Sequence, residues 1–134
     1  MPAVVLVVDV ANVMGSRPDG WWRDRPGAAT RLLAALGPLA GTRAPVGPDA
    51  AEVAVTRVVA VLEGAARTAS APDDAPGLDV VRADGSGDDA IAAAAAALAA
   101  TGVTPLVVTA DRGLRARLPA GALVSGPRIL LAAL

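Results

Sequence analysis

Val4-Val5-Leu6-Val7-Val8-Asp9 is the stretch of sequence that decides the fold of this chain. Its apolar run, Val4 to Val8, has no alternation with polar residues, so both faces of the strand that it forms must be covered. Central strands of parallel sheets, with helices packed on either side, have this pattern. The run ends at a carboxylate, and ligands of open parallel sheets bind beyond the carboxyl ends of the strands. Asp9 is therefore the first candidate for a functional residue.

The rest of the chain alternates predicted strands with predicted helices. Strands are predicted at residues 53–62, 78–81, 105–109 and 122–124; helices are predicted from near Asp24 to Leu39, over residues 86–100 and 114–118, and from Pro127; residues 15–23 and 42–51 are predicted to be connections. This alternation predicts one α/β domain over residues 1–134. We expect a three-layer α/β/α sandwich around a mostly parallel sheet of about five strands, with residues 4–8 in the centre.

The composition excludes several classes of chemistry. The 134 residues include no Cys and no His, and all 12 basic residues are Arg. Disulfides, thiol catalysis, a Ser-His-Asp triad and the usual zinc sites are therefore excluded. A metal would have to be a hard ion held by oxygen. The formal net charge of −1 attracts no nucleic acid, so RNA binding would need a local Arg patch.

The sequence shows no targeting or membrane segment. The apolar amino terminus lacks the basic start and the cleavage pattern of a signal peptide. The longest apolar stretch, residues 90–100, is too short to span a bilayer. We expect a cytoplasmic protein that has no membrane partner.

Acidic residues follow three predicted strands. They are Asp9, the pair Asp88 and Asp89, and Asp111. Right-handed crossovers bring the carboxyl ends of parallel strands to one edge of the sheet, where these acids would meet. Clustered carboxylates without a balancing Lys repel one another unless a cation lies among them. We therefore predict a Mg²⁺ or Mn²⁺ site that supports metal-assisted hydrolysis, with Glu63 at the end of residues 53–62 as a further candidate ligand.

Helix capping is the alternative explanation for two of these acidic positions. Ser86-x-x-Asp89 resembles a capping box, which explains Asp88 and Asp89 about as well as metal binding does. Asp111 could cap the helix that follows it, although its place after a strand favours a functional role. For Asp9 the sequence pattern offers no capping role.

The ordered set of these motifs resembles the PIN-like NYN domains. It comprises Val7-Val8-Asp9-Val10-Ala11-Asn12-Val13, Gly85-Ser86-Gly87-Asp88-Asp89-Ala90-Ile91 and Val107-Val108-Thr109-Ala110-Asp111-Arg112, and it covers nearly the whole chain. The resemblance implies a metal-dependent ribonuclease that cleaves single-stranded RNA. It also implies that Asp9, one or both of Asp88 and Asp89, and Asp111 bind the metal, with Asn12 as a polar partner.

The chain departs from the family pattern in one place. Many members carry a further acid one helical turn after the last Asp, where this chain has Arg115. The loop of residues 15–25, Gly-Ser-Arg-Pro-Asp-Gly-Trp-Trp-Arg-Asp-Arg, is similar to a small bacterial subgroup that often carries an NTP pyrophosphohydrolase label. An NTP pyrophosphohydrolase, or a catalytically weak module that binds RNA or a partner protein, are therefore the alternatives. The sequence leaves open whether the chain forms a homodimer.

Aromatic and basic residues near the acids supply candidate substrate contacts. Trp21 and Trp22 are the only aromatic residues, and they share a loop with Arg17 and Arg23. Stacking of unpaired bases is one role for this loop. The alternative, which we favour for one of the two tryptophans, is packing over the core. Arg112 and Arg115 follow Asp111 and are candidates for phosphate binding, or they simply neutralise the acids.

Overall fold

The central strand of the fold is β1 (Ala3–Asp9), which pairs in parallel with β3 (Val53–Leu62) on one side and with β5 (Pro105–Val108) on the other. The computed structural model describes all residues 1–134. The six-stranded sheet has the order β2-β3-β1-β5-β6, and β4 also pairs with β3. β4 (Leu78–Arg82) and β6 (Leu123–Ser125) are parallel to their neighbours, whereas β2 (Thr42–Ala44) is antiparallel to the start of β3.

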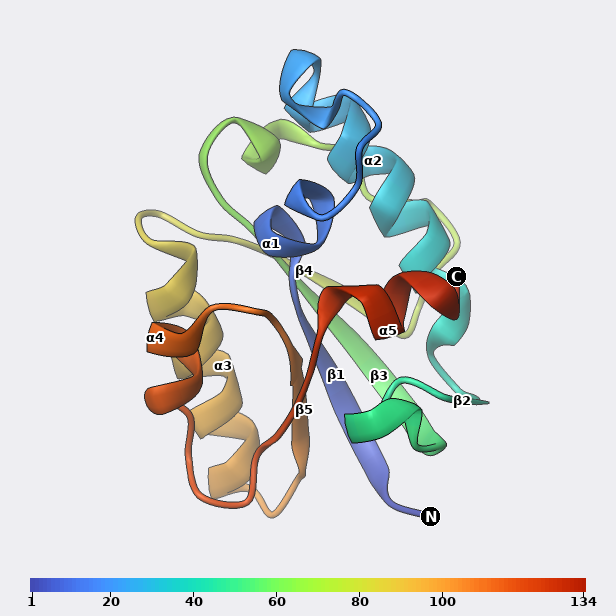
Figure 1. The fold of residues 1–134 in the computed structure, drawn as a ribbon, viewed down its shortest axis with the longest axis vertical. Helices are drawn as coiled ribbons and strands as arrows, with labels where there is room; N and C mark the ends of the chain where they lie inside the picture. Colours follow the sequence, from blue (N-terminus) through green and yellow to red (C-terminus); the bar gives the residue numbers. More distant parts are fainter.

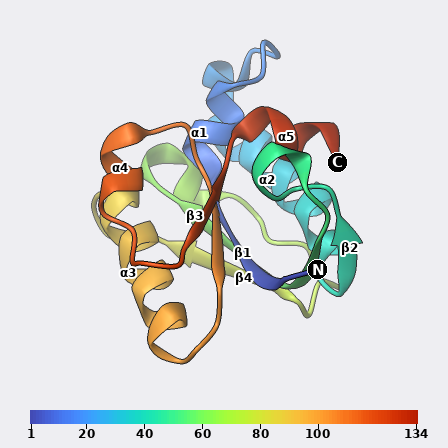
Figure 2. The ribbon, with the colours of Figure 1, turned by 60° about the horizontal axis from the view of Figure 1, so that its bottom comes forward.

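Helices cover both faces of this sheet. The α-helices are α1 (Val10–Gly15), α2 (Arg25–Leu36), α3 (Gly87–Ala100), α4 (Arg112–Ala116) and α5 (Pro127–Ala132); short 3₁₀ turns are η1 (Trp21–Arg23), η2 (Gly37–Leu39), η3 (Pro48–Ala50) and η4 (Gly64–Thr68). α1, α2 and α5 lie on one side of the sheet, and α3 and α4 on the other (Figures 1 and 2). None of these helices combines the length and the hydrophobicity that spanning a membrane requires.

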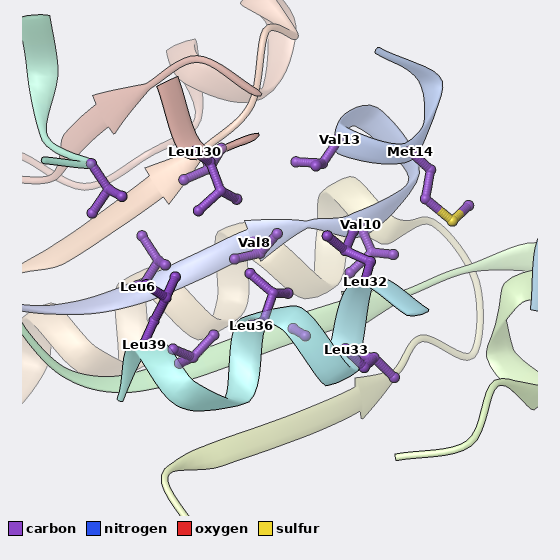
Figure 3. Packing of buried hydrophobic residues seen from close by; sticks show 14 of the residues in the cluster. Leu6, Val8, Val10, Val13, Met14, Leu32, Leu33, Leu36, Leu39 and Leu130 are labelled. Atoms are coloured by element: carbon purple, nitrogen blue, oxygen red, sulfur yellow. The ribbon is translucent and has the colours of Figure 1, made fainter. Parts of the chain in front are cut away.

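Successive side chains of β1 enter two different cores, as the period of a strand requires. Leu6 and Val8 belong to the larger cluster, where they meet the leucines of α2 and Leu130 of α5 (Figure 3). Val7 belongs to the smaller cluster with Ile91 of α3 and Leu114 of α4. All of these side chains are completely buried. The uninterrupted apolar run of β1 is therefore explained by helices on both of its faces.

The predicted α/β/α architecture and the central position of the first strand are confirmed. Two elements were not predicted. β1 passes directly into α1, because Asp9 both ends the strand and caps the helix. β2 is a three-residue edge strand within the stretch predicted to be a connection. The first long helix begins at Arg25 with Asp24 as its cap, as predicted, but its α-helical part ends at Leu36.

Truncation of a β1 core residue tests this arrangement. Leu6→Ala should lower the free energy of unfolding by about 2–5 kcal/mol, since it removes a completely buried side chain and leaves a cavity. The matched control is Leu134→Ala at the exposed carboxyl terminus, which should change it by less than about 0.5 kcal/mol. Urea denaturation of both variants measures the difference; equal effects would show that β1 is not at the centre of the core.

Candidate active site

Asp9 is the most buried acid of the carboxyl edge, with 5% of its surface exposed. Its Oδ1 accepts a hydrogen bond from the backbone N–H of Asn12 at 3.3 Å, which caps α1. Its Oδ2 accepts one from the hydroxyl of Thr109 at 2.9 Å. The expectation that Asp9 has no capping role is therefore wrong; the helix that it caps, α1, has only six residues and shows no helical period in the sequence.

The loop after β5 is held against the end of β1 by side chains of both elements. The Thr109 hydroxyl, which bonds to Asp9, also accepts a hydrogen bond from the backbone N–H of Asp111 at 3.1 Å. The side-chain oxygen of Asn12 accepts one from the backbone N–H of Ala110 at 2.8 Å. Sequence reasoning missed Thr109; its only signal is a hydroxyl at the end of an apolar strand, two residues before an acid.

Asp111 and the acidic pair both lie at helix amino termini. Asp111 Oδ1 accepts a hydrogen bond from the N–H of Leu114 at 3.0 Å and so caps α4. The Ser86 hydroxyl caps α3 by accepting one from the N–H of Asp89 at 3.4 Å. Capping uses only one oxygen of Asp111, and the side chain of Asp88 has no hydrogen-bond partner in the protein. Capping therefore leaves acceptor oxygens at this edge free for a ligand.

Glu63 directly follows β3 and reaches the amino terminus of α3. Its Oε2 accepts a hydrogen bond from the backbone N–H of Gly87 at 3.0 Å. A side chain at position 87 would collide with this carboxyl group, since a Cβ there would lie 2.8 Å from the carboxyl carbon. The glycine therefore lets Glu63 lie against the helix terminus, where the helix dipole favours a negative charge.

These acids influence one another electrostatically. Burial raises the pKa of Asp9, the hydrogen bonds from Thr109 and Asn12 oppose this rise, and the charges of Glu63 and Asp88 add to it. Desolvation, followed by the charges of Asp111 and Glu63, raises the pKa of Asp88, and the positive charge of Arg117 partly opposes this rise. The charges of Glu63 and Asp88 thus act on Asp9, and the charges of Asp111 and Glu63 act on Asp88. The acids predicted from the sequence therefore lie at one edge of the sheet and repel one another.

Basic groups balance only part of this negative charge. The molecule has two ion pairs, and at the acidic edge only Asp89 takes part in one, with Arg117 at 2.6 Å. Asp9, Glu63 and Asp111 are in neither pair. Hard oxygen donors with unbalanced charge are the donor set that Mg²⁺ and Mn²⁺ prefer. The residues at this edge fit such an ion in their chemistry.

The side chains as they stand form no ready-made cage. No three acids are placed so that they could hold one metal ion together. Mg²⁺ commonly binds through only one or two carboxylates and keeps several waters or takes substrate oxygens instead. A Mg²⁺ site at this edge would therefore need only one or two direct carboxylate ligands, with further acids nearby.

Arginines lie on both sides of the acidic edge. Arg112 and Arg115 are exposed on α4, which packs on one face of the sheet through Leu114. Arg17 is half-buried and Arg23 is exposed; both belong to the segment that follows α1 on the other face (Figures 1 and 2). None of the four forms an ion pair with an acid. They are free to contact an anionic ligand.

The two tryptophans differ in environment. Trp21 is half-buried and packs against the larger core cluster, whereas Trp22 has 55% of its surface exposed. The rings meet edge to face with centroids 6.0 Å apart. The guanidinium of Arg25 lies over Trp21 at 5.3 Å and that of Arg23 over Trp22 at 5.7 Å. One tryptophan packs on the core, as the sequence analysis favoured.

Comparison with known proteins adds a structural likeness. No protein-family model matches the chain, and no curated protein sequence matches it. The fold is similar to a crystal structure of Rae1 (YacP) from Bacillus subtilis, with a TM-score of 0.65 and 19% sequence identity over 98% of this chain and 74% of that one. The likeness shows the fold, and it supports the α/β/α architecture expected from the sequence.

The raised pKa of Asp9 predicts a pH-dependent stability. Between the ordinary value of 3.8 and the higher folded value, the folded state binds more protons than the unfolded state. The contribution of Asp9 to stability therefore falls as pH rises through this window and is then constant. Asp9→Asn lacks this loss, so in EDTA at pH 7 it should melt at the same temperature as the wild type or higher. Thermal melts from pH 3 to 8 test this; a wild type that gains stability over the variant as pH rises would contradict it.

Proposed function

We propose that the chain is a Mg²⁺- or Mn²⁺-dependent ribonuclease that hydrolyses phosphodiester bonds of single-stranded RNA. The observation that supports this most is the meeting of Asp9, Glu63, Asp88 and Asp111 at the carboxyl edge of the sheet with no arginine paired to them. A divalent ion would relieve the repulsion among these acids. The resemblance to PIN-like NYN domains points to the same activity.

Asp9, Asp88 and Asp111 are the candidates for the one or two direct carboxylate ligands of the ion, since no three acids are placed to hold it together. Asp9 is rigid, since both of its oxygens are fixed by hydrogen bonds, and each oxygen keeps a second lone pair for a ligand. Asp88 and Asp111 each keep at least one oxygen without a protein partner. When bound, the ion supplies an activated water and neutralises charge on the phosphoryl oxygens. Asp89 is less suited, because its carboxylate is paired with Arg117.

The other polar groups orient the acids and the substrate. Thr109 and Asn12 are positioning residues, because they join the loop that carries Asp111 to the end of β1. The side-chain NH₂ of Asn12 has no partner in the protein and can donate to a phosphate oxygen. Arg112 and Arg115 on one side, and Arg17 and Arg23 on the other, suit the backbone of a strand that crosses the acidic edge.

Metal binding and hydrolysis should be lost together when Asp9 is replaced. Saturating Mn²⁺ should stabilise the wild type, by about 2.7 kcal/mol at a hundredfold excess over the dissociation constant, and should stabilise Asp9→Asn clearly less. Cleavage of labelled single-stranded RNA by Asp9→Asn should fall by at least about tenfold to a hundredfold.

The matched control for this experiment is Asp73→Asn, which removes the same charge from an exposed loop. It should leave both the Mn²⁺ shift and the cleavage rate unchanged. A parallel reaction with NTPs distinguishes a pyrophosphohydrolase from a ribonuclease. If Mn²⁺ changes the melting temperature of neither the wild type nor Asp9→Asn, and no RNA is cleaved, the metal-dependent activity is refuted. A module that binds RNA or a partner protein is then the better hypothesis.

The two tryptophans should respond differently to truncation. Trp22→Ala should weaken binding of single-stranded RNA by about 1–3 kcal/mol, since an exposed ring beside Arg23 can stack on a base, and it should leave the melting temperature unchanged. Trp21→Ala should lower the melting temperature, because Trp21 packs on the core. Fluorescence anisotropy and thermal melts measure both. Unchanged RNA affinity in Trp22→Ala would exclude the stacking role.

A further inference from the structure

A hollow of about 280 Å³ adjoins the acidic edge between α1, α2 and the end of β3. We call it the Trp21 hollow; its lining includes Ala11, Met14, Trp21, Arg25, Glu63 and Ala66. Its volume is close to the lower limit of about 300 Å³ for small-molecule pockets, so it suits a single planar ring system. Its walls are an apolar floor, an aromatic ring and a guanidinium group.

Glu63 belongs both to this hollow and to the acidic edge. Its Oε2 accepts one hydrogen bond, from the N–H of Gly87, and keeps a second lone pair, whereas its Oε1 has no hydrogen-bond partner in the protein. The charge of Glu63 is felt by Asp9, the acid proposed to hold the metal. A group bound in the hollow would therefore lie next to the place of phosphodiester cleavage.

We propose that the Trp21 hollow binds one unpaired base of the RNA beside the cleaved phosphodiester, and that Glu63 makes it selective for guanine. This inference rests on the proposed ribonuclease function, because it assigns the substrate position next to the same acids. Unpaired bases stack on aromatic rings and on Arg guanidinium planes, and the hollow offers both in Trp21 and Arg25.

The carboxylate determines which base is preferred. An ionised carboxylate only accepts hydrogen bonds and can do so from two donors at once. The Watson–Crick edge of guanine presents two adjacent donors, N1–H and the N2 amino group. Adenine and cytosine present one amino group there, and uracil places carbonyl oxygens on both sides of its N3–H. Glu63 thus favours guanine and disfavours uracil.

Mononucleotide binding tests the hollow without requiring catalysis. In Trp22→Phe the only tryptophan fluorescence comes from Trp21, which lines the hollow. In EDTA, GMP should quench this fluorescence with a dissociation constant about tenfold or more below that of UMP. Glu63→Gln, in the same background, keeps an acceptor for Gly87 but replaces a carboxylate oxygen with a donor. It should remove or reverse the preference for GMP.

A filling variant and its control locate the site. Ala11→Leu places a larger side chain in the hollow and should abolish binding of both nucleotides. Ala97→Leu makes the same change on an exposed position of α3 and should not affect it. Circular dichroism tests whether both variants fold. If Ala11→Leu does not fold, the comparison of Glu63→Gln with its parent protein decides alone. Equal quenching by GMP and UMP, no quenching by either, or a GMP preference that survives Glu63→Gln would overturn the inference.

Mapping of RNA cleavage sites separates this inference from the proposed function. Cuts by the wild type should concentrate next to guanines, and cuts by Ala11→Leu should lose this preference. Cleavage that ignores sequence, together with equal GMP and UMP binding, would refute the selective hollow and leave the ribonuclease intact. GMP-selective binding without cleavage of any RNA would refute the ribonuclease and leave the hollow as a guanine-binding site.

Discussion

The hydrogen bond from the Thr109 hydroxyl to Asp9 is the interaction on which the acidic edge depends. It joins the ends of two neighbouring parallel strands, β1 and β5, inside the protein. The same hydroxyl accepts a hydrogen bond from the backbone N–H of Asp111. One buried group thus orients two acids, Asp9 and Asp111, that are 102 positions apart in the sequence. Loss of a partner from a buried hydrogen-bond network costs about 1–3 kcal/mol. The Asp9 carboxylate is therefore held from two sides, whereas the acids around it are half-exposed.

The fold holds this edge in place without help from charges. β1 is covered on both faces by apolar side chains, and its neighbours continue the same two cores. Asp9, at the end of this strand, is buried away from water, and this burial raises the pKa of its carboxyl group. The repulsion among Asp9, Glu63 and Asp88 opposes folding, but it is small compared with the burial of a whole sheet. The protein can thus keep a strained set of acids that a ligand would relieve.

The fold could be predicted further than the site could. The apolar run of β1 and the Ala-rich α3 have strong local patterns, so their type and place follow from the sequence alone. α1 and β2 are too short to show a period, and they form because the sheet edge and the core hold them. The convergence of Asp9 and Asp111 follows from topology. The roles of Thr109, Gly87 and the Trp21 hollow depend on contacts between distant segments, which no local pattern carries.

The arginine at position 115 is compatible with a metal site of this kind. An ion such as Mg²⁺ needs only one or two direct carboxylates, so the proposed site on Asp9, Asp88 and Asp111 would not require a further acid on α4. Arg117, directly after α4, shows how a positive charge acts here: it pairs with Asp89 and leaves one acid fewer without a balancing charge. Arg115 has no such partner and stays exposed. Its guanidinium is therefore free to contact an anionic ligand, which is the role that the proposed function gives it.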